Sequence, residues 1–168
     1  MGRAFGFALG VLLVIGSQVI GASTPRADHN PGDEPLAVQP QVHDLRFGRI
    51  AGNGTASSYV TVDSATGNKT VGGGAYDLGG NDGPARFILH GEPGHAFLII
   101  LPPSQVLIGR NNPANQATVT DFESTPSGTG VIGPNGKAEV EVGGTLELEA
   151  NQPADTYKVT IPFEAVYP

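Results

Sequence analysis

Cysteine is absent from the 168 residues of this chain, tryptophan is absent as well, and methionine occurs only once. A chain without cysteine has no disulfide, no thiol nucleophile and no thioether-linked lipid anchor. Its stability must therefore come from buried apolar side chains and from backbone hydrogen bonds. Sugar-binding surfaces commonly use exposed tryptophan or tyrosine rings, and only four tyrosines are present here.

Positive charge is scarce too, with nine Lys and Arg against sixteen Asp and Glu and a formal net charge of −7. Nucleic acids and anionic membranes attract clustered basic side chains. No basic cluster occurs in this sequence. The composition therefore predicts an acidic, soluble protein that binds no nucleic acid.

The first 22 residues have the pattern of a secretory signal peptide. Arg3 precedes an apolar stretch from Ala4 to Ile15, and small residues around Ala22 and Ser23 suit signal peptidase. We predict cleavage after Ala22 or Ser23, which makes the mature protein secreted, periplasmic or attached to the cell surface, with no membrane insertion after cleavage. The alternative is an uncleaved anchor, because residues 4–22 nearly reach the length that spans a bilayer.

After the leader, apolar residues recur with period two, the pattern of half-buried β-strands. Twenty-five glycines and fourteen prolines oppose long helices. Many short strands without crossover helices predict an all-β fold, an antiparallel Ig-like sandwich over residues 42–168, with a closed barrel as the alternative. Predicted strands include Asp44–Ile50, Ser58–Asp63, Ala85–Gly91, Ala96–Leu101, Val106–Gly109 and Ala117–Ser124.

The C-terminal residues DTYKVTIPFEAVYP predict one long half-buried strand. Proline cannot donate to a β-ladder, so Pro162 indicates a free edge or a bulge there. The apolar face of this strand comprises Tyr157, Val159, Ile161, Phe163, Ala165 and Tyr167.

The preceding segment, KAEVEVGGTLELEA, predicts a hairpin whose turn is formed by Gly143 and Gly144. That register places Glu141 opposite Glu147, and like charges directly opposed cost up to about 1 kcal/mol. Glutamates that guard an exposed face against edge pairing are one explanation. A bound cation or basic partner is another.

Residues 23–41 form a predicted arm between the leader and the sandwich. Its first half, to Glu34, is polar and rich in proline. Its second half alternates, with Leu36, Val38 and Val42 on one face. This half could be the domain's own first strand, or a donor strand that completes the sheet of a neighbouring subunit.

The stretch LHGEPGH holds residue types that bind metals or move protons, namely His90, Glu92 and His95. Pro93 and Gly94 suit the centre of a type II turn. We interpret the stretch as the tip of a hairpin, with a zinc site as the alternative.

Two other segments carry site hypotheses. Asn135 and Gly136 predict a hairpin turn. Asp77 and the run from Gly79 to Gly83 offer oxygen atoms suited to calcium, without the spacing of an EF-hand loop.

Four short motifs occur together in this sequence, namely Leu45-x-Phe47-Gly48, Gly91-Glu92-Pro93-Gly94 leading into Phe97-x-Ile99-x-Leu101-Pro102, Val142-Gly143-Gly144-Thr145-Leu146, and Tyr157-x-Val159-x-Ile161 with the closing Tyr167. Together they resemble the secreted bacterial family catalogued as domain of unknown function 4402 (DUF4402). The resemblance covers about Leu45 to Tyr167 and implies an exported β-sandwich domain, similar to pilin and spore-coat subunits, with no catalytic residue. Unlike chaperone–usher pilins, this chain has no cysteine pair.

These observations predict a non-enzymatic cell-surface or fimbria-like structural subunit without a cofactor. It would assemble with itself or with other envelope subunits by strand addition. A monomeric extracellular or periplasmic module that binds a glycan or another envelope component is the second hypothesis. A metal-dependent enzyme that uses His90, Glu92 and His95 is the third.

Overall fold

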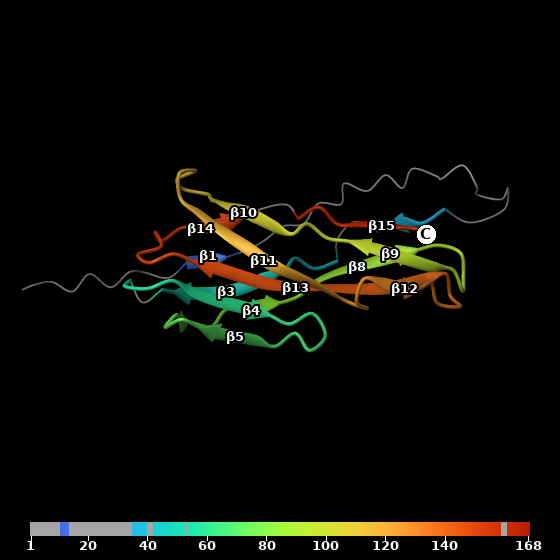
Figure 1. Ribbon diagram of the computed structural model, residues 1–168, viewed down its shortest axis with the longest axis horizontal. Helices are drawn as coiled ribbons and strands as arrows, with labels where there is room; N and C mark the ends of the chain where they lie inside the picture. The colour runs from blue at the N-terminus through green and yellow to red at the C-terminus, as the bar shows by residue number, and fades with distance from the viewer. Residues whose placement is uncertain (1–10, 14–34, 40–41, 53, 159–160) are drawn as a thin grey trace, which may run out of the picture.

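The computed structural model describes residues 11–13, 35–39, 42–52, 54–158 and 161–168 (Figure 1). All regular secondary structure in these ranges is β-strand, so the predicted all-β fold is confirmed. The predicted cleavage site and the first half of the arm lie outside the described residues. The strands are β1 Val11–Leu13, β2 Ala37–Val38, β3 Arg46–Ala51, β4 Ser58–Val62, β5 Lys69–Gly72, β6 Tyr76–Asp77, β7 Asp82–Gly83, β8 Ala85–His90, β9 Ala96–Ile100, β10 Ser104–Gly109, β11 Gln116–Thr125, β12 Thr129–Val131, β13 Lys137–Leu148, β14 Thr156–Lys158 and β15 Glu164–Val166.

The strands form a large sheet and a small one. The large sheet has the order β2-β8-β13-β11-β10-β14-β1-β3-β6, with β4 and β5 joined through β13 and with β7 paired to β3. The small sheet has the order β12-β9-β15. Neighbouring strands are antiparallel, as predicted, but β1 and β14 run parallel.

The core lies between the inward faces of these strands. Along β8, buried and half-buried residues alternate from Ala85 to His90, as period two requires. The rings of Phe87 on β8 and Phe163 near β15 stack with centroids 4.0 Å apart. Burial of each such side chain contributes about 1.5–3 kcal/mol.

Strand β13 is a central strand of the large sheet, and it shows that the predicted hairpin at Gly143 and Gly144 is wrong. It runs unbroken from Lys137 to Leu148, pairs first with β8 and then with β4 on one side, and pairs with β11 on the other. A Cβ atom on Gly143 would lie 2.2 Å from the carbonyl oxygen of Val62. The glycine therefore serves the close approach of two backbones rather than a turn.

Because Glu141 and Glu147 lie on one continuous strand, they do not face each other across a hairpin. Glu141 lies opposite Arg86 on β8, and Glu139 forms an ion pair with the same arginine. Glu147 lies between Thr118 on β11 and Tyr59 on β4. The pairings described for β13 therefore place no two glutamates opposite each other.

The predicted C-terminal strand alternates as expected but is not continuous. Its first part, β14, belongs to the large sheet, and its last part, β15, belongs to the small sheet. Pro162 lies between the two, where the backbone leaves one ladder for the other. Tyr157, Ile161, Phe163 and Ala165 are buried, whereas Val159 lies outside the described residues.

Candidate functional site

The strand β1 has a neighbouring strand on each side in the large sheet. It lies between β3 and β14 (Figure 1), with Leu12 opposite Arg49 on one side and opposite Thr156 on the other. Its residues belong to the predicted leader. We call this position the β3–β14 slot and define its rims as Gly48–Ile50 and Thr156–Tyr157.

The two rims of the slot run in opposite directions, because β1 is parallel to β14 and antiparallel to β3. Each rim carries a row of backbone N–H and C=O groups. Unpaired rows of this kind are a template for another strand. In the structure β1 pairs with both rows, so residues 11–13 of the chain fill the slot.

Lys69 fixes the β3 rim from the side away from the slot. Its Nζ donates to Asp77 Oδ1 at 2.8 Å and to Asp82 Oδ1 at 2.9 Å, and its side chain is only 7% exposed. Burial disfavours the charged ammonium, but the hydrogen bonds to Asp77 and Asp82 outweigh burial and raise the pKa of Lys69. The hydrogen bond from Lys69 lowers the pKa of Asp77, and the backbone N–H of Gly79 lowers it further.

This ammonium bears on the calcium hypothesis for the segment from Asp77 to Gly83. The carboxylate oxygens that could ligate an ion already accept hydrogen bonds from Lys69. The backbone beside them is tied to β3, since Arg49 N donates to Gly79 O at 2.7 Å. The arrangement holds β6 and β7 against β3.

Asp155 fixes the β14 rim, and sequence reasoning missed it. Its carboxylate accepts hydrogen bonds from the backbone N–H groups of Asn111, Asn112 and Thr156 and from the side-chain amides of Asn111 and Asn115, at 2.7–3.1 Å. The backbone N–H of Asn111 is the largest cause that lowers the pKa of Asp155, to about 2. The signal was an aspartate directly before a strand together with an asparagine-rich turn after β10.

The LHGEPGH stretch forms the predicted turn but not the predicted hairpin. His95 N donates to Glu92 O at 3.2 Å and Gly94 has a φ of 82°, as a type II turn requires. The flanking strands diverge, because β8 belongs to the large sheet and β9 to the small one. The hairpin prediction is therefore wrong, and the turn is a crossover between sheets.

The three polar residues of this stretch contact other parts of the chain, and two of them share Tyr167 as a partner. His90 Nε2 lies 3.2 Å from Gln39 Oε1, and the His95 ring meets the Tyr167 ring edge-on at 5.7 Å. The N–H of Glu92 donates to the Tyr167 hydroxyl at 2.8 Å. In the described part of the chain, no three His, Cys, Asp or Glu side chains are gathered as metal ligands.

The other predicted turn, at Asn135 and Gly136, leads from β12 into β13. Gly136 N donates to Gly133 O at 3.0 Å, and Gly136 has a φ of 72°. Its role is structural, because it closes the connection between the small and the large sheet.

The second half of the predicted arm lies in the chain's own sheet. Ala37 and Val38 pair with β8, and Leu36 is 3% exposed within the core. Val42 is 36% exposed, and its N–H donates to Arg86 O at 3.1 Å. Donation of these residues to a neighbour stays a prediction, and it would require β2 to leave β8.

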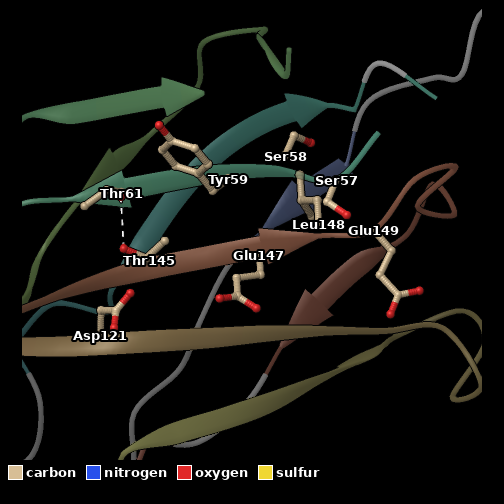
Figure 2. Close-up of a pocket in the computed structure, with 9 residues that line it drawn as sticks. All are labelled: Ser57, Ser58, Tyr59, Thr61, Asp121, Thr145, Glu147, Leu148 and Glu149. Carbon is tan, nitrogen blue, oxygen red and sulfur yellow. Dashed lines mark hydrogen bonds between the residues drawn. The ribbon is translucent and has the colours of Figure 1, made fainter. Parts of the chain in front are cut away.

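A polar hollow of about 620 Å³ lies over β4 and β13 (Figure 2). Tyr59 is 46% exposed, and its ring lies so close over Gly72 that a Cβ atom there would be 2.3 Å from the ring. The hydroxyls of Thr61 and Thr145 lie 2.9 Å apart. The lining residues are Ser57, Ser58, Tyr59, Thr61, Asp121, Thr145, Glu147, Leu148 and Glu149.

The family model for DUF4402, described as a domain of unknown function, matches residues 36–167. The chain belongs to the DUF4402 family. The match begins at Leu36, so β2 lies within the family domain and β1 lies before it. No curated protein and no solved structure matches this chain. Within the described ranges, no helix has the length and hydropathy needed to cross a bilayer.

Proposed function

We propose that this DUF4402 protein is an exported, non-enzymatic structural subunit of a cell-surface or fimbria-like assembly, joined to its neighbours by strand addition. The observation that carries the proposal is the place of β1 in the large sheet. A segment of the predicted leader is paired on both sides there, with β3 and with β14.

Export explains why this observation bears on function. If signal peptidase removes residues 1–22, the mature chain loses β1 and keeps both rims of the slot. Strands with unpaired edges add a strand from another polypeptide or aggregate. An assembly that supplies the missing strand therefore turns an incomplete sheet into a complete one.

The partners of the buried charged groups and of the candidate metal ligands support a structural role. The carboxylate of Asp155 accepts hydrogen bonds from a turn, and the ammonium of Lys69 holds two aspartates beside β3. The side chains of His90 and His95 contact Gln39 and Tyr167. Each of these groups serves the packing of one segment against another.

The test is to export the full chain from a bacterial host and to analyse the product by mass spectrometry and by size-exclusion chromatography with light scattering. We expect a chain that begins at Ser23 or Thr24 and that is recovered in complexes joined through a shared sheet. A cleaved product that remains monomeric and forms no complex with any envelope protein would contradict the proposal.

A monomeric binding module for a glycan is the second candidate, and the polar hollow favours it. The exposed ring of Tyr59 lies beside hydroxyl and carboxylate groups, the combination that sugars use for stacking and hydrogen bonding. A glycan array probed with the mature protein tests this candidate. Specific binding that Tyr59→Ala abolishes would support it, and an array without signal would end it.

A further inference from the structure

We propose that the β3–β14 slot accepts a strand from a different polypeptide, with apolar side chains at alternate positions, rather than from a second copy of this chain. The inference rests on the proposed function and names the partner of the slot.

The geometry of the slot fixes how a donor strand must lie. Since the two rims run in opposite directions, any inserted strand is parallel to one rim and antiparallel to the other. In a strand with neighbours on both sides, successive N–H groups point alternately to each neighbour. Every residue of the donor within the slot therefore needs its N–H, and proline is excluded there.

The register also fixes which side chains the donor needs. The position held by Val11 lies opposite Ile50, and the position held by Leu13 lies opposite Tyr157. Ile50 and Tyr157 are both fully buried. Because residues opposite one another share a face of the sheet, the first and third donor positions belong to the core face and must be apolar.

The middle donor position has different surroundings. It lies opposite Arg49, which is exposed, and Thr156, which is half-buried. This position is on the solvent face and tolerates a polar side chain. The slot thus selects the pattern apolar–any–apolar.

The residues of the predicted mature chain that precede the family domain lack this pattern in their sequence. Residues 23–34, STPRADHNPGDE, are polar and contain two prolines. The next segment pairs with β8, with Leu36 buried in the core. Since this segment lies inside the family domain and β1 lies before it, a second copy of the mature chain has no spare strand to offer.

The experiment uses the mature chain, Ser23–Pro168, and a synthetic peptide with the sequence of residues 5–16, FGFALGVLLVIG, flanked by lysines for solubility. At a peptide concentration of about 100 times Kd, we expect the melting temperature to rise by about 5–10 °C. Three matched peptides test the pattern. Leu12→Pro and Leu13→Lys should each weaken binding at least about tenfold, and Leu12→Lys should bind nearly as well as the parent.

A disulfide cross-link tests the register. Because the chain has no native cysteine, the introduced cysteine is the only thiol in the protein that can react with the peptide. A peptide with Leu12→Cys should form a disulfide with the variant Arg49→Cys, because these positions are opposite in the sheet. Arg110→Cys is the matched control. Arg110 N donates to Thr156 O, so it lies beyond β14 on the side away from the slot, and it should not cross-link.

The outcomes separate the two claims. If the peptide does not raise the melting temperature of the mature chain and the cross-link does not form, the slot does not accept a strand. This inference is then overturned, whether or not the protein assembles through another surface. If the mature chain self-associates and the disulfide variant Ala37→Cys/His90→Cys, which pins β2 to β8, abolishes this, then the donor is a second copy. The choice of a different polypeptide is then wrong, and the proposed function stands.

Discussion

Strands β13 and β1 hold similar positions in the large sheet, since each has neighbours on both sides, yet their origins differ. β13 spans Lys137–Leu148 and pairs with three strands of the same domain. β1 spans Val11–Leu13, belongs to the predicted leader and precedes the region matched by the family model. The comparison teaches that one part of the sheet is built within the family domain alone, whereas another part includes a strand that precedes this domain.

The rims of the slot are nevertheless fixed without β1. The Lys69 ion pairs hold β6 and β7 against β3, and the Asp155 carboxylate holds the turn after β10 against β14. Both groups act from the side away from the slot. These contacts hold both rims independently of the pairing with β1.

The largest expected effect concerns β13. Leu146 is fully buried, so Leu146→Ala should lower the free energy of unfolding by about 2–5 kcal/mol. Leu98 on β9 is 38% exposed, and Leu98→Ala is the matched control with an expected loss below about 1 kcal/mol. Urea denaturation measures both. Equal losses would mean that the core is not centred on β13.

The next effect concerns the β14 rim and depends on pH. The folded state lowers the pKa of Asp155 from 3.8 to about 2, so its contribution to stability is complete above about pH 4 and is lost as pH falls towards 2. Asp155→Asn should lower the melting temperature at pH 7 and remove part of the fall between pH 4 and pH 2. Asp121→Asn is the control, since asparagine tolerates the φ of 49° at that position. Melting curves of Asp155→Asn that parallel those of the wild type at every pH would contradict the role of Asp155.

The β3 rim should respond less. Lys69→Met keeps much of the apolar stem and removes the ammonium that two carboxylates share. We expect a loss of about 1–2 kcal/mol in the free energy of unfolding, reduced because both aspartates are partly exposed. The exposed Lys137→Met is the control. A neutral Lys69→Met would mean that β6 and β7 are held by backbone pairing alone.

The smallest effect lies at the LHGEPGH turn. Tyr167→Phe removes the hydroxyl that accepts the N–H of Glu92, and we expect a loss of about 0.5–1.5 kcal/mol in the free energy of unfolding. Thermal denaturation measures it, with the exposed Tyr59→Phe as the control. If His90, Glu92 and His95 instead serve a metal, zinc would raise the melting temperature of both proteins, and we expect no such rise.

Most strands could be predicted from the sequence, because the alternation of apolar and polar residues depends only on which face of each strand is buried. The predicted strands Ser58–Asp63 and Ala96–Leu101 match β4 and β9 within one residue at each end. Pairing partners were less predictable, because they depend on contacts between distant segments. β8 and β9 flank a good turn and still belong to different sheets.

Glycine was the other source of error. Gly143 and Gly144 resemble a hairpin turn in the sequence, but Gly143 is required where the backbone of Val62 approaches β13. A turn glycine and a close-approach glycine look the same without the partner strand. The slot itself could not be predicted, because nothing in the leader residues indicates that they pair with β3 and β14.

Amide hydrogen exchange of the mature chain, with and without the leader peptide, tests the central claim most directly. We predict that Gly48–Ile50 and Thr156–Tyr157 exchange much faster than the centre of β13 in the mature chain alone, and that the peptide slows their exchange at least about tenfold. Rims that are already as protected as β13 in the absence of any added strand would contradict an open slot.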